Sequence, residues 1–203
     1  MSISFPLPQL SVIDVSDETG QSDLASVERA KQDPGAFAEL YGRYLDPVCQ
    51  YCFRRLDSRE AAEDATSQVF MQALAGLPRF DGNDGSFRAW LFRIAHNVVI
   101  DQYRAARPTV TLELDSELTD QSSLPEDLVV DADRSRTLRQ AIEQFPERQR
   151  QVVELRLAGL NGPEIGEVLG CRARTVDVAQ FRAVARLRSL LGVTVAPEGA
   201  RDV

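Results

Sequence analysis

Histidine, lysine and cysteine are scarce in this sequence of 203 residues, which holds one histidine, one lysine and three cysteines. A single histidine, His96, excludes multi-histidine metal sites and most histidine-based catalytic triads. Three cysteines cannot close a disulfide framework, which favours a reducing environment. No apolar run approaches the ~20 residues of a membrane-spanning helix, and the first residues lack the basic and apolar parts of a secretory signal. We therefore expect a cytoplasmic protein without membrane insertion.

The sequence gives little support to metal-dependent or nucleotide-dependent chemistry. Cys49 and Cys52 form a CxxC pair, and the remaining candidate ligands, Cys171 and His96, fall in other motifs. Because no second CxxC accompanies the first, we interpret these thiols as buried structural residues and expect neither a metal nor a cofactor. No GxxxxGK[ST] motif is present, so nucleotide hydrolysis is not predicted.

An adjacent acidic pair, Glu63 and Asp64, raises the question of a metal-dependent nucleic-acid-processing enzyme. Adjacent residues on a helix do not face one another, so the pair is a poor two-carboxylate site. The enzyme hypothesis is therefore a minor alternative, and we expect that the protein is not an enzyme.

Charge is strongly segregated along the chain, although the net charge is -8. Residues 108–133 carry 8 acidic and no basic side chains, whereas residues 134–192 carry 11 basic and 6 acidic ones. All but one of the 23 basic residues are arginines, whose side chain binds phosphate in a planar, bidentate manner. The last folded segment is therefore a basic module suited to nucleic acid, although genome composition is the simpler explanation of the arginine bias.

Apolar residues recur at helical spacing over most of the first half of the chain. The spacing predicts a short helix from Leu24, a helix over 37–52, a helix over 58–77 and a long helix from Ser86 to the residue before Pro108. Residues 1–22 have no such period and are interpreted as a flexible leader. No strand pattern of useful length occurs. We therefore predict an all-α protein whose first domain spans residues 23–107.

Residues 108–133 lack a helical period and are interpreted as an acidic flexible linker to a second domain over residues 134–192. In that domain a short helix ends in a turn at Gly170, and a basic helix follows from Arg174. Two helices joined by a tight glycine turn, the second of them basic, are typical of a helix-turn-helix. An ordinary amphipathic helix with a solvated arginine face is the alternative. Residues 193–203 form the predicted tail.

Aromatic and arginine residues are interleaved over residues 80–107. Aromatic rings stack on unpaired bases while arginines follow the backbone, so this pattern is typical of single-stranded nucleic-acid binding. The helical spacing of Phe87 and Trp90 also suits these rings to a core, and this second interpretation stays open.

Two blocks of the sequence are similar to one known family. Asp64-Ala-Thr-Ser-Gln68-Val-Phe70, then Phe80 before a glycine loop, and then the tract from Trp90 through Arg93 and Asn97 to Arg104 closely resemble region 2 of bacterial sigma factors. The tract from Phe145 to Leu157, with Glu164-Ile165, Gly170 and Thr175-Val176, resembles region 4. Only these two regions occur, separated by a short linker, and this layout resembles that of the extracytoplasmic-function (ECF) subfamily.

The resemblance implies an alternative RNA polymerase sigma factor, which recruits the polymerase to promoters and helps to open them. The partners that it implies are core RNA polymerase, contacted through the β′ clamp helices and the β subunit, and promoter DNA in duplex and single-stranded form. Many members are held by an anti-sigma factor, which is a candidate third partner. The acidic segment 108–133 would enter the polymerase cleft as a mimic of nucleic acid, or act as a solvated tether.

The resemblance also carries over individual site residues. The core-binding residues would be Asp64, Gln68 and Gln72. The minus-ten DNA-binding residues would be Phe80, Arg88, Trp90, Arg93, Asn97 and Arg104, with Phe80 and Asn97 lining the pocket for a flipped base. The minus-thirty-five DNA-binding residues would be Arg172, Arg174, Thr175, Asp177, Phe181, Arg182 and Arg186.

The sequence departs from the family pattern near the second DNA surface. Where the family often has a basic, a small polar and another basic residue, this chain has Asp177, Val178 and Ala179. An aspartate cannot neutralise phosphate but accepts a hydrogen bond from cytosine N4. Asn161-Gly162-Pro163 also departs from the usual lead into the helix-turn-helix.

A free-standing helix-turn-helix regulator that binds duplex DNA alone is the first alternative to a sigma factor. Such a regulator would bind a palindromic duplex tightly without polymerase. It leaves the motif from Phe80 to Arg104 unexplained.

Overall fold

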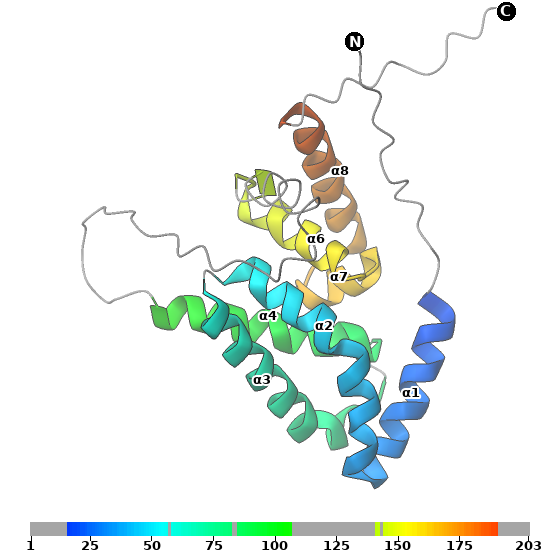
Figure 1. Cartoon of the computed structure of the whole chain (residues 1–203). Coiled ribbons are helices and arrows are strands. Elements are labelled where there is room, and N and C mark those ends of the chain that lie inside the picture. The colour runs from blue at the N-terminus through cyan, green and yellow to red at the C-terminus, as the bar shows by residue number, and fades with distance from the viewer. Residues whose placement is uncertain (1–15, 57, 83–84, 107–140, 143, 191–203) are drawn as a thin grey trace, which may run out of the picture.

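The computed structural model describes residues 16–56, 58–82, 85–106, 141–142 and 144–190. Over these ranges every regular element is a helix and none is a strand, which confirms the all-α prediction (Figure 1). The elements are α1 (Ser16–Gln32), the 3-10 turn η1 (Pro34–Ala36), α2 (Phe37–Arg55), α3 (Arg59–Gly76), the 3-10 turn η2 (Leu77–Arg79), α4 (Phe87–Ala106), α6 (Glu147–Leu157), α7 (Gly162–Val168) and α8 (Ala173–Leu190). The predicted linker at 108–133 and tail at 193–203 lie outside the described residues. None of the described helices is long and apolar enough to cross a membrane.

The first helix, α1, begins at Ser16 and therefore within the segment 1–22 that the sequence predicted as a leader. Its first turns are polar and have no apolar period, so pattern analysis detected the helix only from Leu24 onward. The remainder of the predicted leader, residues 1–15, lies outside the described part of the chain.

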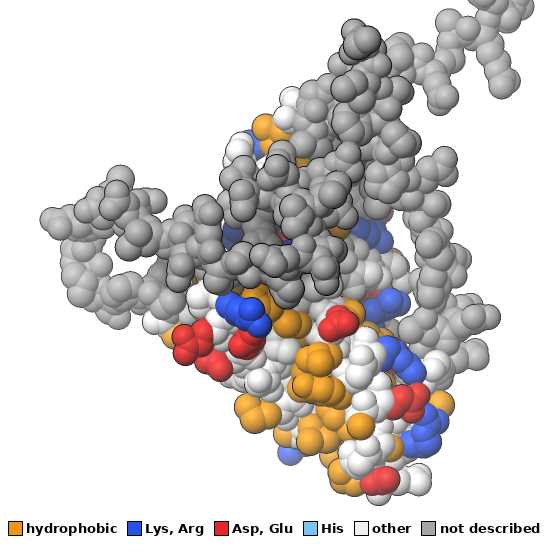
Figure 2. Space-filling view, viewed as in Figure 1, with side chains coloured by type: hydrophobic (Ala, Val, Ile, Leu, Met, Phe, Trp, Pro, Cys, Tyr) orange, Lys and Arg blue, Asp and Glu red, His pale blue; other side chains and the backbone are white. Residues whose placement is uncertain are grey.

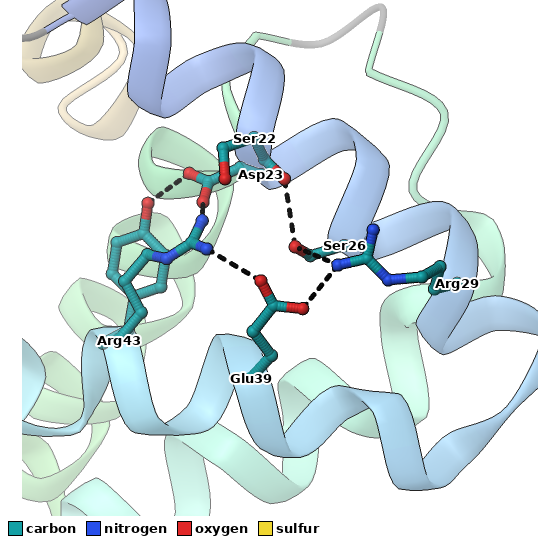
Figure 3. Close-up of polar contacts among 7 residues, drawn as sticks. Ser22, Asp23, Ser26, Arg29, Glu39 and Arg43 are labelled. Carbon is teal, nitrogen blue, oxygen red and sulfur yellow. Dashed lines mark hydrogen bonds and ion pairs between the residues drawn. The ribbon is translucent and has the colours of Figure 1, made fainter.

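A polar network between α1 and α2 holds α1 against the first domain (Figure 3). Asp23 of α1 is buried and accepts hydrogen bonds from Tyr44 Oη and Arg43 Nη1 of α2. The second terminal nitrogen of Arg43 donates to Glu39 Oε1 at 3.1 Å, and Glu39 also accepts from Arg29 of α1. A buried carboxylate with two donors has its charge satisfied, so this network fixes α1 in addition to apolar packing.

Helices α2, α3 and α4 form the core of the first domain. α2 buries most of the apolar stripe that its spacing predicted, namely Phe37, Leu40, Tyr44, Val48, Tyr51 and Cys52. Tyr41, which the spacing also assigned to this stripe, is 42% exposed. Ser58 caps α3 by accepting a hydrogen bond from Ala61 N at 3.0 Å, as serine commonly does at this position. α4 buries Phe87, Leu91 and Val98 as predicted, whereas Trp90 is only partly buried against the same core.

Helices α6, α7 and α8 form the second domain, in which α7 and α8 are the predicted helix-turn-helix. Asn161 and Glu164 make a capping box at the start of α7: Asn161 Oδ1 accepts from Glu164 N at 2.9 Å, and Glu164 Oε2 accepts from Asn161 N at 2.8 Å. Gly170 has a φ of 61°, a conformation that glycine adopts without steric cost. A Cβ on Gly166 would lie 2.7 Å from Cys171 O. Both glycines therefore allow the tight turn between the helices.

The second domain is docked on the first. α7 contacts α4 and α6 contacts α2, and in Figure 1 the three helices of the second domain lie against one side of the first domain. The buried apolar residues of the two domains form one continuous cluster. The sequence predicted two domains and a linker but gave no sign of this contact.

Candidate polymerase and nucleic-acid interfaces

The three residues expected to bind core polymerase share one face of α3. Asp64, Gln68 and Gln72 are separated by four residues each, and all three are exposed. This spacing places them one above the other along the helix. The structure therefore brings the predicted core-binding residues together on the surface.

Large apolar side chains accompany these polar residues, and the sequence analysis did not identify them as functional. Met71 and Leu74 of α3 are 66% and 44% exposed. Tyr41 of α2 is also exposed and packs its ring against Phe70, with 4.6 Å between the ring centroids. Figure 2 shows hydrophobic side chains gathered on the face where α2 and α3 lie. Exposed apolar groups beside polar ones are typical of a protein-binding surface.

The predicted minus-ten residues on α4 differ in how far they reach the surface. Asn97 and Arg104 are exposed, and Arg88, Trp90 and Arg93 are partly exposed. Arg93, Asn97 and Arg104 share one side of α4 at helical spacing. Between the last two lies the exposed Asp101, whose Oδ1 accepts a hydrogen bond from Arg104 Nη1 at 3.3 Å.

Phe80 is placed in the core. Its side chain is 4% exposed, and its ring centroid lies 5.8 Å from that of Phe87 and 5.2 Å from that of Trp90. In this arrangement the Phe80 ring packs against Phe87 and Trp90 inside the first domain. The predicted stacking of Phe80 on a flipped base stays a prediction.

Arg88 and Ser86, at the start of α4, bind the second domain. Arg88 Nε donates to Glu164 Oε1 at 3.1 Å and Arg88 Nη1 donates to Gly159 O at 3.2 Å. Ser86 Oγ donates to the same Glu164 oxygen at 2.6 Å. An arginine that the family resemblance assigns to minus-ten DNA is therefore paired with a carboxylate of α7.

A second polar contact between the domains is centred on Arg55, the last residue of α2. Its two terminal nitrogens donate to Glu154 Oε2 at 3.1 Å and to Glu147 Oε1 at 2.8 Å. The side chains of Arg55 and Glu154 are each only 2% exposed. The guanidinium also lies 5.6 Å from the ring centroid of Tyr103, within the range of a cation–π contact. Burial raises the pKa of Glu154 to about 7, although the charge of Arg55 opposes this shift.

The minus-thirty-five candidates lie on α8 and the turn before it, and all are exposed. They are Arg172, Arg174, Thr175, Asp177, Phe181, Arg182 and Arg186. The opposite face of α8 is buried through Val176, Ala179 and Ala183. The Phe181 ring is 76% exposed, which is unusual for a phenylalanine that has no binding role. The structure therefore brings the predicted residues together on one surface of the second helix of the motif.

The departures from the family pattern can now be located. Asp177 and Val178 are exposed on α8, whereas Ala179 is buried and belongs to the core of the second domain. Asn161 is the N-cap of α7 and a proline lies in the first turn, so Asn161-Gly162-Pro163 is a favourable helix N-terminus despite its departure from the family pattern. Only Asp177 and Val178 change the surface that would meet DNA.

The thiols show no arrangement suited to a metal. Cys52 is buried, and burial raises its pKa to about 11. Cys49 and Cys171 are partly buried. Among the described residues, no group of three or more histidine, cysteine, aspartate or glutamate side chains could hold a metal ion.

Comparison with known proteins agrees with the geometry. The family model for Sigma-70 region 2 matches residues 40–109, and that for Sigma-70 region 4 matches residues 135–187. The ECF RNA polymerase sigma factor SigW of Bacillus subtilis is 34% identical over 172 residues, which cover 79% of this chain and 91% of SigW. The match to region 2 rules out a free-standing helix-turn-helix regulator as a description of the whole chain.

Two solved structures have a similar fold. One is CnrH in complex with the cytosolic domain of CnrY, with a TM-score of 0.65 and 25% identity, covering 86% of this chain and 99% of that one. The other is the sigma factor RpoE in complex with the anti-sigma factor NepR from Bartonella quintana, with a TM-score of 0.58 and 21% identity, covering 78% and 98%. With both sigma regions present, the chain belongs to the ECF family of RNA polymerase sigma factors.

Proposed function

We propose that this sigma factor binds core RNA polymerase through the exposed face of α3. Asp64, Gln68 and Gln72 supply polar contacts there, and Met71 and Leu74 supply apolar area beside them. Exposed apolar side chains that are surrounded by polar groups cost the free protein little stability. They contribute much binding free energy when a partner excludes water from them. The exposed Met71 among these polar residues is the observation that carries the proposal. We expect the β′ clamp helices and the β subunit of the polymerase to contact this chain.

We infer that the first domain binds the minus-ten element as single-stranded DNA along α4. Arg93 and Arg104 would contact phosphates, and Asn97, which lies between them on α4, would bind a base edge through its amide; the support is the exposure of Asn97 and Arg104 and the partial exposure of Arg93. Extruding a base costs a few kcal/mol, so binding of the extruded base at the exposed Asn97 would help strand opening without ATP. The protein itself would perform no covalent chemistry.

The second domain, in our proposal, binds the minus-thirty-five element as duplex DNA through α8. Arg174 and Arg182 would contact phosphates and base edges, and the exposed Phe181 ring offers an apolar surface for thymine methyl groups. Residues 23–107 and 134–192 are the limits that we infer for the two domains. We expect the protein to act in the cytoplasm, where polymerase and promoter DNA are found.

An anti-sigma factor is a further candidate partner. The support is the fold shared with RpoE, which was solved with the anti-sigma factor NepR. A protein that covers the exposed face of α3 would compete directly with core polymerase, because both partners would need Met71 and its neighbours.

The test combines the purified chain with core polymerase from its host. We expect co-elution of the two in gel filtration and selective initiation on a subset of genomic fragments. Replacing Asp64 and Gln68 together with alanine should weaken co-elution first, whereas Asn97→Ala should impair promoter opening and leave co-elution intact. A chain that neither binds core polymerase nor directs initiation would refute the proposed function.

A further inference from the structure

Helix α1 reaches the segment that precedes α4 and follows Phe80. A Cβ on Gly82 would lie 3.3 Å from Leu24 Cδ2, so this leucine lies directly against the backbone of the Phe80 segment (residues 80–82). Among the described residues other than the chain neighbours of Gly82, no second heavy atom lies within 4 Å of that point. Leu24 is 45% exposed, whereas Val27, almost one turn later, is fully buried. Val27 therefore anchors α1 in the core, and Leu24 covers the Phe80 segment.

The residue before Leu24 is linked to the same segment through the core. Asp23 is buried and accepts a hydrogen bond from Tyr44 Oη of α2. Burial, followed by this hydrogen bond, raises the pKa of Tyr44, so its hydroxyl keeps the proton that it donates. The Tyr44 ring packs against Phe87, the first residue of α4, and the Phe87 ring packs against Phe80, with 5.6 Å and 5.8 Å between the respective centroids. Because a buried hydroxyl needs a partner, Asp23 fixes the first ring of this aromatic stack.

The contact made by Leu24 comes from within the first domain. At Gly85, closer to α4 in the same loop, the neighbouring side chain is Glu167 of α7, which belongs to the second domain. That contact requires the two domains to be docked, whereas α1 packs on α2, α4 and η2 of the first domain. Support of the Phe80 segment by α1 therefore does not depend on where the second domain lies.

We propose that α1 positions the Phe80 segment and the start of α4 for an unpaired base of the minus-ten element. Leu24 supports the backbone at Gly82, and Asp23 holds the aromatic stack through Tyr44, so both are positioning residues that do not touch the strand. This inference rests on the proposed function, since it assumes that this end of the first domain binds unpaired DNA. A segment that is already held in place loses less conformational freedom when DNA binds, which raises affinity.

The first test compares Leu24→Ala with the control Leu157→Ala. The two leucines are 45% and 48% exposed, and Leu157 ends α6 in the second domain. The probe is a fluorescein-labelled single strand that carries the minus-ten element of a promoter found in the initiation assay. Core polymerase saturated with wild-type or variant chain is titrated with this strand. Abasic strands, each without one base of the element, identify the base that wild type binds most strongly.

Leu24→Ala should bind the intact strand about two- to tenfold more weakly than wild type, the cost of ordering one more side chain on binding. Its affinity for the strand that lacks the preferred base should equal that of wild type, because the phosphate contacts are unchanged. Leu157→Ala should match wild type on both strands. Equal losses of Leu24→Ala on both strands would mean that α1 only stabilises the domain, and no loss would mean that Leu24 does not support the segment. Either result overturns the proposal.

Tyr44→Phe tests the path through the core, and Tyr51→Phe is its matched control. Both tyrosines are buried in α2, seven residues apart, and each variant loses one hydroxyl and one hydrogen bond. The Tyr44 ring packs against Phe87, whereas the Tyr51 ring packs against Phe92. The two variants should lose similar stability, but only Tyr44→Phe should lose preference for the intact strand over the abasic one. The same preference in both variants would show that Asp23 does not act on the segment through Tyr44.

Trp90, the only tryptophan of the chain, gives a readout that needs no polymerase. Its ring is partly buried, with its centroid 5.2 Å from that of Phe80. In the free chain, Leu24→Ala and Tyr44→Phe should each raise the quenching of Trp90 emission by acrylamide above that of the control. If wild type binds the strand but the variants match their controls in quenching and in base preference, the positioning role alone is wrong. A wild-type chain that binds neither polymerase nor the strand would instead refute the proposed function, and this role of α1 with it.

Discussion

Tyr51 Oη of α2 and His96 Nδ1 of α4 lie 3.0 Å apart in the buried seam between these helices. Burial lowers the pKa of His96 to about 4, and the nearby charge of Arg55 lowers it further, whereas Glu147 acts in the opposite direction. The histidine is therefore neutral near pH 7 and shares the hydrogen bond with the tyrosine. The only histidine of the chain therefore packs inside the first domain as a buried hydrogen-bonding group.

The first prediction concerns the pH dependence that His96 confers. A histidine whose folded pKa lies below its ordinary 6.5 stabilises the fold above pH 6.5, and this contribution is lost as the pH falls toward 4. The full loss is about 3 kcal/mol, from ~1.4 kcal/mol for each pKa unit. The difference between His96→Asn and wild type in free energy of unfolding should therefore change by roughly this amount between pH 7 and pH 4. Urea titrations at several pH values measure it.

Tyr51→Phe is the control for this pH effect. It removes the hydrogen bond but keeps the buried imidazole, so its stability should fall with acid as steeply as that of wild type. Glu154, whose raised pKa gives the opposite slope between pH 4.5 and about 7, is common to all three proteins and cancels in the comparison. Equal slopes in His96→Asn and wild type would show that His96 is not buried in its neutral form.

Local elements of the fold were predictable from the sequence because their signals are local. The apolar stripe from Phe37 to Cys52 and the glycine turn at Gly170 lie within a few residues of the structures that they specify. The contact of Arg55 with Glu154 was not predictable in this way. In the sequence, Arg55 looks like an ordinary basic residue near the C-terminus of a helix. Its partner Glu154 lies in the other domain, so no sequence periodicity connects the two residues.

The candidate sites were predictable only in part. Family resemblance located Asp64 and Gln68 on the surface, but it did not show that Met71, three residues after Gln68, is also exposed. An apolar residue in an amphipathic helix is usually counted as core, and its exposure depends on whether another helix covers that face. Phe80 shows the reverse case, since its ring is buried where the resemblance suggested a pocket wall.

Met71→Asp tests the apolar part of the core-binding surface. Because Met71 is exposed, the change should alter the free energy of unfolding by no more than about 0.5 kcal/mol. A charge in a desolvated interface is costly, so affinity for core polymerase should fall by about tenfold or more. Ala25→Asp, on the exposed side of α1, introduces the same charge and should leave the affinity unchanged. Equal affinities of the two variants in a fluorescence titration with core polymerase would show that Met71 is not part of the core-binding surface.

Arg174 and Arg182 test the second DNA surface. Each arginine that neutralises a phosphate contributes about 0.9 to the slope of log affinity against log salt concentration. Arg174→Ala and Arg182→Ala should each weaken binding of the holoenzyme to promoter duplex and reduce that slope by about one. Lys31→Ala removes an equal charge far from α8 and should leave the slope unaltered. Unchanged slopes in both arginine variants would mean that α8 does not approach the phosphates.

Phe181→Ala separates base contacts from phosphate contacts on the same helix. The ring carries no charge, so its loss should reduce affinity for the preferred promoter while the salt slope stays that of wild type. Discrimination between promoter and random duplex should fall, because the apolar contact to bases is what the variant removes. A loss that is equal on promoter and random duplex would instead assign Phe181 a structural role.

Gly166 and Gly42 offer a matched pair for the packing of the helix-turn-helix. Both lie within helices, where alanine is otherwise favoured by about 0.5–1 kcal/mol. Nothing lies within 4 Å of a Cβ on Gly42, so Gly42→Ala should stabilise the first domain by that amount. A Cβ on Gly166 would lie 2.7 Å from Cys171 O, a backbone atom that cannot move without opening the turn. Gly166→Ala should therefore destabilise the second domain by about 1–3 kcal/mol.

The consequence of Gly166→Ala should be confined to the second domain. Displacing Cys171 shifts the start of α8, and with it Arg172 and Arg174, so duplex binding should weaken together with thermal stability. Co-elution with core polymerase depends on α3, which does not contact this turn, and should persist. Thermal unfolding monitored by circular dichroism, beside the co-elution assay, measures both effects. A variant as stable as wild type would show that the close approach of α7 to the turn is not required for the fold of this motif.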